Sequence, residues 1–468
     1  MSDDALLQGA LDAARDFGCA ERRHRIAPEV DPATIRAHLR EVYGDFAQPL
    51  SGQTVLADVV RMLREWNLHI THPRYFGLFN PSVVPASVAG DLLVAAFNPQ
   101  LAAWSHAPAA NEIERYTLAF FARRLGLPEH TVAHFTSGGA EANHTAFVVA
   151  LADGFPEHVE QGLAALPRRP VVYASGESHH SLDKIARATG LGRSALRLVA
   201  VDTAMRIDVA ALRAAIERDR AAGLAPFLVV ATAGTTGVGA VDPLPELARL
   251  CAEERLWLHV DAAWGGAACL SPRLRAEISS IERADSVTWD AHKYLSVPMG
   301  AGMFFCSRPG AVRRAFEART PYMPQPIDGT VDPYSSTLQW SRRHTGLKVF
   351  MALAALGEEG YRRQIEHQAD MGDAMRAALR RRRFTVLGDG PLPVVCFTRQ
   401  EIAGGRIAAA DLAAWTVRQN FWVSPLRVPG HERPVLRACI TSYATQQGDV
   451  EALAETVDRG IAELAPSS

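Results

Sequence analysis

Apolar residues recur every three or four positions along the first 80 residues, which predicts amphipathic helices. The spacing is clearest in three stretches, at 5–17, 32–46 and 54–66. More helices are expected across 85–126. We therefore expect residues 1–82 to form a helical N-terminal segment.

From about residue 130 the pattern changes, because short runs rich in β-branched and aromatic residues alternate with helical segments. These runs predict strands at 171–175, 196–201, 227–232, 256–263, 286–290 and 302–307. Such alternation is typical of a mainly parallel sheet with covering helices. From about 345, the order helix, strand, strand, helix, strand, helix predicts a smaller α+β domain. The expected domains are therefore 1–82, 83–345 and 346–468.

Composition and charge narrow the possible classes of protein. The 468 residues are 48% hydrophobic and 21% charged, which is typical of a globular protein. A net charge of −2 gives no electrostatic reason to bind nucleic acid or a membrane surface. No apolar run approaches the roughly 20 residues of a membrane helix. The six cysteines form no CxxC or Cys/His cluster, so we expect no metal site and a cytoplasmic protein.

Lysine is rare in this chain: of 49 basic residues, only Lys184, Lys293 and Lys348 are lysine. Arginine stays protonated, whereas lysine can lose its proton and act as an amine nucleophile. Lys293, in "DAHKYL", follows an expected strand and stands beside His292, which makes it the strongest candidate. An ordinary structural role remains the alternative for each of the three.

Two further motifs follow expected strands. "TSGGAEAN" (136–143) places two glycines before a helix, a pattern typical of a phosphate site; the alternative is an ordinary turn with Thr136 or Ser137 as the helix cap. Asp261 ends the apolar run of "LWLHVDAAWGG". A buried carboxylate needs a partner, either in a structural ion pair or in a cationic ring nitrogen lying beside the small Ala263.

His179 and His180 follow the expected strand 171–175 and could stack on a ring or move protons, or could be ordinary surface residues. Ligands collect beyond the carboxyl ends of parallel strands, where all of these motifs are expected. A phosphate cradle, an amine, a carboxylate and a stacking ring are together what pyridoxal phosphate requires.

The motif order resembles that of the group II pyridoxal-phosphate decarboxylases, which include aromatic amino-acid, glutamate, histidine and diaminobutyrate decarboxylases. The resemblance runs from about residue 71 to about 450, through "TSGGAEAN", "HHSLDKIARATGLG", "ATAGTTGVGAVDPL", "HVDAAWGG" and "DAHKYL". It implies fold type I, the aspartate-aminotransferase fold, with a mainly parallel seven-stranded sheet. It also implies decarboxylation of an L-amino acid to an amine and carbon dioxide, in a homodimer with active sites at the interface.

The resemblance also implies a role for individual residues. Lys293 would form the Schiff base with the cofactor, Asp261 would pair with its pyridine nitrogen, and His179 would stack on its ring. The other cofactor contacts implied are Gly138, Gly139, Ala140, Thr236, Ala263 and His292.

The substrate side of the site is less closely matched. Tyr334, with Tyr322 as the alternative, would be the loop tyrosine that returns a proton. His179 is the other candidate to deliver that proton, and Arg437 would orient the substrate. Phe79 and Trp104 could favour an apolar substrate or simply pack in the core. Alternative functions are transamination, aldehyde formation, a lyase reaction or cofactor binding without catalysis. The substrate itself is not readable from the sequence.

Overall fold

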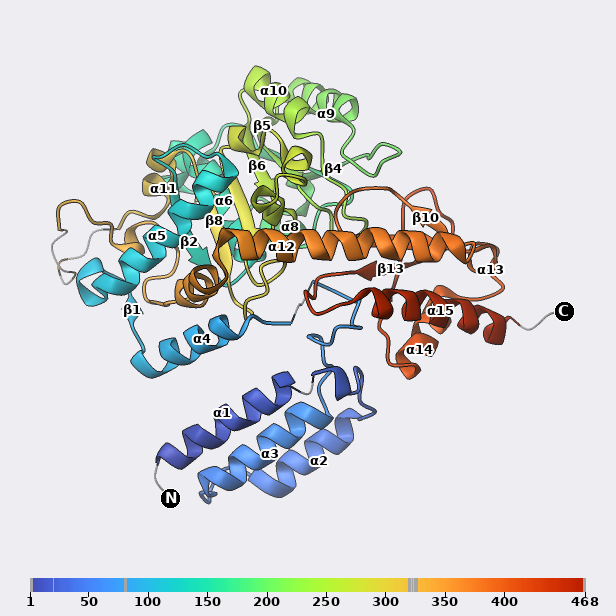
Figure 1. Cartoon of the computed structure of the whole chain (residues 1–468). Coiled ribbons are helices and arrows are strands. Elements are labelled where there is room, and N and C mark those ends of the chain that lie inside the picture. The colour runs from blue at the N-terminus through green and yellow to red at the C-terminus, as the bar shows by residue number, and fades with distance from the viewer. Residues whose placement is uncertain are drawn as a thin grey trace.

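The computed structural model describes residues 3–19, 21–79, 82–318, 321, 323 and 327–465. Three helices come first, α1 (Asp3–Cys19), α2 (Pro32–Tyr43) and α3 (Gly52–Glu65), and they project from the rest of the molecule (Figure 1). The start of α2 is fixed locally, because the Asp31 carboxylate accepts hydrogen bonds from the backbone amides of Ala33 and Thr34. The helices predicted over the first 80 residues are therefore present.

A seven-stranded sheet forms the centre of the molecule. Its strands are β2 (Val132–Thr136), β3 (Pro170–Ser175), β4 (Leu196–Val199), β5 (Ala225–Thr232), β6 (Trp257–Asp261), β7 (Ser286–Asp290) and β8 (Gly302–Cys306). They lie in the order β2-β8-β7-β6-β5-β3-β4, and β8 runs in the direction opposite to that of the other six strands. The mainly parallel seven-stranded sheet is confirmed; β2 is the strand that the apolar pattern did not single out.

Helices cover both faces of this sheet because its strands are apolar on both faces. Along β5, Leu228 and Val230 contact one apolar cluster, while Val229 and Ala231 contact the other, as expected for a side-chain period of two. The helices of this region are α4 (Pro85–Phe97), α5 (Pro108–Leu125), α6 (Gly139–Gly154), α7 (Pro156–Gln161), α8 (Ser181–Ala188), α9 (Val209–Ala221), α10 (Leu244–Glu254) and α11 (Pro309–Phe316). A two-stranded ribbon pairs β1 (Gln100–Leu101) with β9 (Arg342–Arg343).

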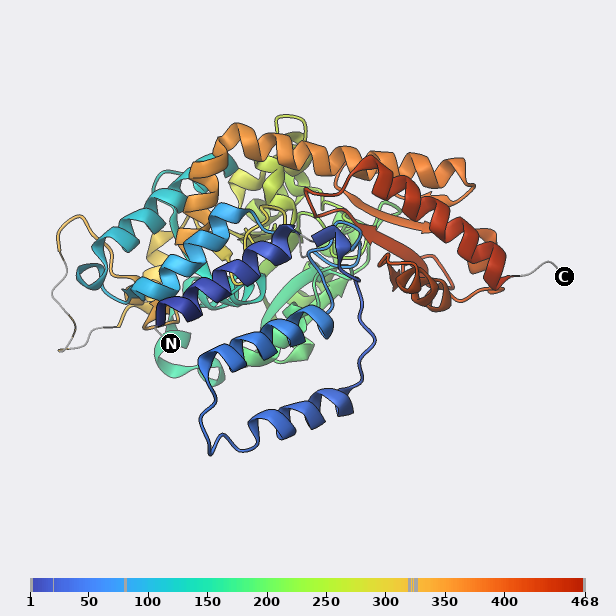
Figure 2. The ribbon, with the colours of Figure 1, turned by 60° about the horizontal axis from the view of Figure 1, so that its bottom comes forward.

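The long helix α12 (Gly346–Arg381) leads from the large sheet to a smaller one, with a kink at Gly357, where φ is 65° (Figure 2). The small sheet is antiparallel, in the order β10 (Thr385–Leu387), β11 (Val394–Thr398), β13 (Val435–Cys439) and β12 (Ser424–Leu426). Its helices are α13 (Gln400–Ala403), α14 (Ala409–Arg418) and α15 (Gln447–Leu464). The expected domain boundaries near 82 and 345 stay a prediction.

None of the described helices is both long enough and apolar enough to cross a bilayer. Within the described ranges, no three His, Cys, Asp or Glu side chains are grouped so that they could hold a metal ion.

Candidate active site

The carboxyl ends of β5, β6 and β7 meet at one edge of the large sheet, where Thr232, Asp261 and Asp290 end their strands. The turn after β3 brings His179 to the same edge. The charges of Asp261, Asp290 and Lys293 all act on the His179 imidazole. The structure therefore gathers residues from three separate motifs into one site, at the edge where α/β sheets bind ligands.

Lys293 follows β7 and is partly accessible, with a side chain that is 21% exposed. Its Nζ lies 3.2 Å from Oδ2 of the buried Asp290 and 5.7 Å from the centre of the Phe79 ring. Oδ1 of Asp290 is buried without a hydrogen-bond partner. Since buried polar atoms are normally paired, this orphaned oxygen marks a site that still has room for a donor.

The turn that precedes α6 is packed too tightly for larger residues. A Cβ on Gly139 would lie 2.9 Å from Oδ2 of Asp290 and 3.2 Å from the Cβ of Ala263, and a Cβ on Gly302 would lie 2.6 Å from the Cα of Gly138. The first backbone hydrogen bonds of α6 run from the amides of Glu141 and Ala142 to the Gly138 carbonyl. The amides of Gly139 and Ala140 precede them, so they can donate to an anion. The turn at Gly138, Gly139 and Ala140 thus has the form of a phosphate cradle.

His292 borders this cradle, because a Cβ on Gly138 would lie 3.4 Å from its Cε1. Its Nδ1 accepts a hydrogen bond from the backbone amide of Ala301, at 3.1 Å. Burial lowers the pKa of His292, so the ring is neutral and carries its hydrogen on Nε2. That N–H is a further donor for an anion in the cradle.

Asp261 is buried and accepts two hydrogen bonds. Asn143 Nδ2 donates to Oδ2 at 2.7 Å, and the backbone amide of Ala263 donates to Oδ1 at 3.1 Å. No described basic side chain forms an ion pair with it. The carboxylate, flanked by the small Ala263, therefore fits the protonated ring nitrogen of a flat cofactor.

His179 is held by its own turn. The Ser181 backbone amide donates to His179 Nδ1 at 3.2 Å, and the Ser181 hydroxyl lies 2.8 Å from the same atom. Desolvation lowers the pKa of His179, which favours the neutral ring with its hydrogen on Nε2. His179 is an exposed residue, so a cofactor can reach its ring.

Arg437 reaches the site from β13 of the small sheet. Its guanidinium carbon lies 5.0 Å from the centre of the Phe79 ring, which also contacts Lys293. Nε donates to the Gly237 carbonyl at 3.0 Å and Nη1 donates to the Gly77 carbonyl at 2.7 Å. Nη2 is buried without a partner. Thr236, beside Gly237, is partly exposed at the same place.

Trp104 and Tyr334 belong to a different cluster. The Tyr334 amide donates to the Ala102 carbonyl at 3.1 Å, and its ring lies 4.8 Å from that of Trp340. The Trp104 amide donates to Asp332 Oδ1 at 2.7 Å. None of the contacts that the structure gives these two side chains reaches Lys293. Tyr322, the alternative proton donor, lies outside the described residues.

Sequence reasoning assigned no role to two residues of this site, Asn143 and Asp290, although both lie inside the motifs that it used. Each follows a recognised signal, a helix start or a strand end, but the sequence does not show which groups face each other. The rarity of lysine was only a partial guide. Lys348 is buried and donates to the Met299 carbonyl at 2.7 Å, so its role is structural.

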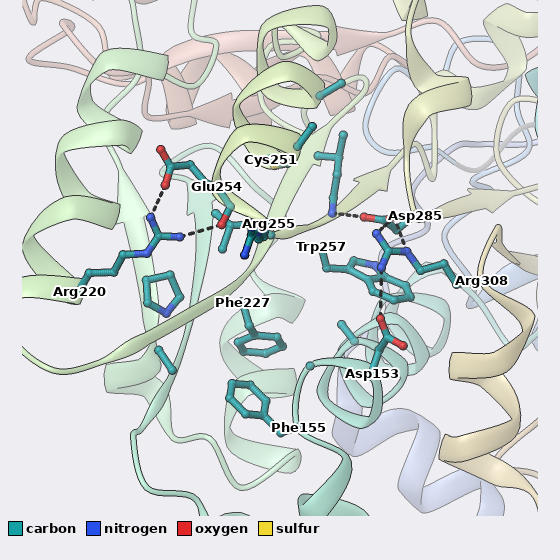
Figure 3. Close-up of a pocket in the computed structure, with 18 of the residues that line it drawn as sticks. Asp153, Phe155, Arg220, Phe227, Cys251, Glu254, Arg255, Trp257, Asp285 and Arg308 are labelled. Atoms are coloured by element: carbon teal, nitrogen blue, oxygen red, sulfur yellow. Dashed lines mark hydrogen bonds and ion pairs between the residues drawn. The ribbon is translucent and has the colours of Figure 1, made fainter.

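A cavity of about 800 Å³ lies at the opposite end of the sheet (Figure 3). It is lined by the starts of β5 and β6 and by the end of α10. None of the predicted site residues lines it. Each carboxylate that lines it is paired with an arginine: Glu254 with Arg220, and Asp153 and Asp285 with Arg308 (Figure 3).

Comparison with known proteins also points to pyridoxal phosphate as the cofactor. The model of the pyridoxal-dependent decarboxylase conserved domain matches residues 37–400. An aromatic-L-amino-acid decarboxylase of Bacillus atrophaeus is 32% identical over 333 residues, which are 70% of this chain and 68% of the relative. An L-2,4-diaminobutyrate decarboxylase of Rhizobium meliloti is 33% identical over 361 residues, 76% of this chain and 70% of the relative.

Among solved structures, Oryza sativa TDC with PLP and tryptamine has a TM-score of 0.90 and 25% identity, and the match covers 99% of both chains. The fold and the family match thus define a pyridoxal-phosphate enzyme of fold type I. The expected fold class and the expected cofactor are confirmed, and the roles of the individual site residues stay predictions. The chain belongs to the pyridoxal-dependent decarboxylase family, whose members are carboxy-lyases acting on amino acids. The phosphate cradle, the cation-free Asp261 and the exposed His179 ring all fit the cofactor.

Proposed function

We propose that this site removes the α-carboxylate of an L-amino acid and releases the corresponding amine and carbon dioxide. The observation that carries the proposal is the arrangement at one sheet edge of an accessible lysine, Lys293, and a buried carboxylate with no basic partner, Asp261. Bound pyridoxal phosphate supplies an electron sink for the carbon that loses carbon dioxide.

The proposal assigns a role to each residue of the site. Lys293 holds the cofactor through its amine, and Asp261 holds the proton of the ring nitrogen. His292 and the amides at Gly138, Gly139 and Ala140 hold the phosphate. His179 and Ala263 confine the ring from its two faces, and Thr236 borders it.

Arg437 is proposed to orient the substrate. Its buried Nη2 has no partner within the described chain, so it can donate to a substrate carboxylate. Two of its other donors are already fixed by backbone carbonyls, which holds the guanidinium in place. Because a tightly bound leaving carboxylate would stabilise the ground state, the task is orientation rather than acceleration of bond breaking.

The direct test is Lys293→Ala, which should abolish carbon dioxide release and the borohydride-trappable bond to the cofactor. Lys184→Ala is the matched control, because Lys184 is exposed and lies on α8. An amino-acid panel scored for carbon dioxide, ammonia, aldehyde and keto acid separates decarboxylation from transamination and aldehyde formation. Turnover by Lys293→Ala at the native rate would contradict the proposal.

The panel also addresses the substrate. The similar proteins named above act on aromatic amino acids and on 2,4-diaminobutyrate. In this chain Phe79 packs against Trp264, with ring centres 4.9 Å apart, and contacts both Lys293 and Arg437. An aromatic wall beside the reactive lysine supports an amino acid whose side chain offers apolar surface.

We further propose that the chain acts as a homodimer. The described residues of α2 and α3 include no buried side chain, and apolar residues on the N-terminal helices are exposed, such as Leu7 at 59% and Leu63 at 52%. Exposed apolar surface of this kind is typical of an interface. A dimer also supports a role for Tyr334 and Trp104, since their cluster could complete the partner's site.

Sedimentation measures the dimer directly, and subunit mixing tests the shared site. If Tyr334 acts across the interface, mixing Lys293→Ala with Tyr334→Phe chains should restore activity, because one site of each hybrid has both groups. No gain on mixing would contradict that placement.

We also propose a cytoplasmic location, which the buried free thiols of Cys251, Cys269, Cys306, Cys396 and Cys439 support.

A further inference from the structure

A continuous chain of buried hydrogen bonds leads to Asp261 from the far end of its own strand. The Trp257 indole donates to Ser286 Oγ at 2.8 Å, and Ser286 Oγ lies 2.8 Å from His259 Nδ1. His259 Nε2 lies 2.9 Å from Asn143 Oδ1, and Asn143 Nδ2 donates to Asp261 Oδ2 at 2.7 Å. All five side chains are buried.

The direction of every bond in this hydrogen-bond chain is determined by its two ends. An indole N–H can only donate, and a carboxylate can only accept. Because Asn143 turns its NH₂ toward Asp261, its carbonyl oxygen faces His259 and must accept a hydrogen from Nε2. The reverse orientation of the amide would place two acceptor oxygens face to face.

His259 therefore has one defined tautomer. Burial lowers its pKa to about 4, so the ring is neutral at pH 7. With its hydrogen on Nε2, the ring can only accept at Nδ1, and the Ser286 hydroxyl must donate there. Thr288 Oγ1 lies 3.3 Å from Nε2 and can share the same hydrogen as a second acceptor.

We propose that this hydrogen-bond chain orients Asp261 toward the pyridine nitrogen of the cofactor and opposes transfer of the ring proton to the carboxylate. Every donor in it points toward Asp261, which favours a carboxylate at that end. Asn143, His259, Ser286 and Trp257 are positioning residues, since none of them touches the reacting atoms. The proposal rests on the role of Asp261 proposed above.

The hydrogen-bond chain also connects parts of the fold that the cofactor does not reach. Asn143 lies on α6, the helix whose first turn forms the phosphate cradle, so one helix serves both ends of the cofactor. Trp257 lies at the wall of the cavity in Figure 3, and the Arg308 guanidinium carbon is 5.1 Å from the centre of its ring. A change at Trp257 should therefore be measurable at Asp261.

The first test uses the unmodified apoprotein. Side-chain ¹⁵N NMR of His259 should show a neutral ring protonated on Nε2 at pH 7. A ring protonated on Nδ1, or a charged ring at that pH, overturns the proposal. This measurement needs no variant and no activity assay, so it is independent of whether any substitution folds.

The second test uses the holoenzyme reconstituted with ¹⁵N-labelled pyridoxal phosphate. Asn143→Ala should shift the ring-nitrogen signal toward the unprotonated form and weaken cofactor binding about tenfold to a hundredfold. Ser286→Ala and Trp257→Phe should give smaller shifts in the same direction, in that order. Asn111→Ala is the control, because Asn111 is a buried asparagine of α5 whose amide donates to the Ala107 carbonyl.

An unchanged ring-nitrogen signal and unchanged cofactor affinity in Asn143→Ala and Ser286→Ala would overturn the proposal. If the wild-type enzyme formed no borohydride-trappable bond at Lys293, the proposed function would fail, and the inference about Asp261 would fail with it. A wrong His259 tautomer together with a normal bond at Lys293 would overturn only the positioning role.

Discussion

The two ends of the central sheet differ in how their charged side chains are satisfied. At the amino ends of the parallel strands, around the cavity of Figure 3, Asp153 and Asp285 share Arg308, and Glu254 pairs with Arg220. At the carboxyl ends, Asp261 has no basic partner among the described residues, and buried atoms of Asp290 and Arg437 lack hydrogen bonds.

The difference teaches where to look for chemistry in this molecule. Around the cavity, every lining carboxylate already has an arginine partner. A site with orphaned buried groups carries an energetic cost that a bound ligand can relieve, since an unpaired buried polar atom costs roughly 1–3 kcal/mol. The unsatisfied end, rather than the end with the cavity, is therefore the functional one.

The largest expected effect comes from exchanging one carboxylate at each end. Asp261→Asn should lower kcat about 10²–10³-fold, because the charge that stabilises the protonated ring nitrogen is lost from a buried site. Asp285→Asn removes a carboxylate at the cavity end that is partly buried, with a side chain 15% exposed, and that accepts a hydrogen bond from the Leu258 amide at 2.7 Å. It should lower stability and leave kcat unchanged. Steady-state carbon dioxide release measures both; equal losses of kcat would contradict the comparison.

A second contrast uses the two ends of α6. Gly139→Ala should weaken pyridoxal-phosphate binding about tenfold to a hundredfold, because the new Cβ would lie 2.9 Å from Asp290 Oδ2. Gly154→Ala, at the cavity end of the same helix, would place its Cβ 4.0 Å from the nearest atom, an ordinary contact. Cofactor titration of the two apoproteins checks the prediction, and it fails if both variants bind as the wild type does.

The comparison also shows which strands and site residues could be predicted from the sequence. Apolar patterns located six strands of the large sheet, because buried parallel strands are continuous apolar runs. The pattern missed β12, a three-residue edge strand with a proline at its centre, Pro425, where a missing N–H is tolerated. Strand ends pointed to Asp261 and Lys293, since chain direction fixes which end of a strand carries ligands.

The rest of the site depends on contacts between distant segments. The bond from Asn143 to Asp261 joins residues 118 positions apart, and Arg437 arrives from the small sheet. The placement of Tyr334 and Trp104 away from Lys293 depends on how a long loop packs on the ribbon near Ala102. No local pattern records such packing, so their roles stay predictions.

A third contrast is between a histidine buried in the sheet, whose protonation affects stability, and the site at the sheet edge, whose groups affect kcat. Burial lowers the pKa of His134, on β2, to about 3, against an ordinary value of 6.5. Below pH 6.5 this histidine binds a proton in the unfolded chain but stays neutral in the folded chain, so the free energy of unfolding falls with acidification. Between pH 7 and pH 5, this one group should lower the free energy of unfolding by about 2 kcal/mol.

Urea unfolding of wild type and His134→Phe at both pH values measures the contribution of His134 to this loss of stability. The variant should lose less stability on acidification than the wild type, by about 2 kcal/mol, and the pH dependence of kcat should be the same in both. Parallel stability curves for the two proteins would show that His134 does not contribute.

The smallest expected effect lies at the rim of the cavity. The Arg220 side chain is 41% exposed and that of Glu254 is 17% exposed, so water screens their ion pair. Arg220→Gln should lower the free energy of unfolding by no more than about 1 kcal/mol, with cofactor content and kcat unchanged. Urea unfolding of Arg220→Gln, Glu254→Gln and the double variant isolates the pair from other effects of each substitution. A loss of cofactor in any of these variants would show that the charges at the cavity rim, which lie outside the buried hydrogen-bond chain from Trp257, also affect the cofactor site, and the division between the two ends would no longer hold.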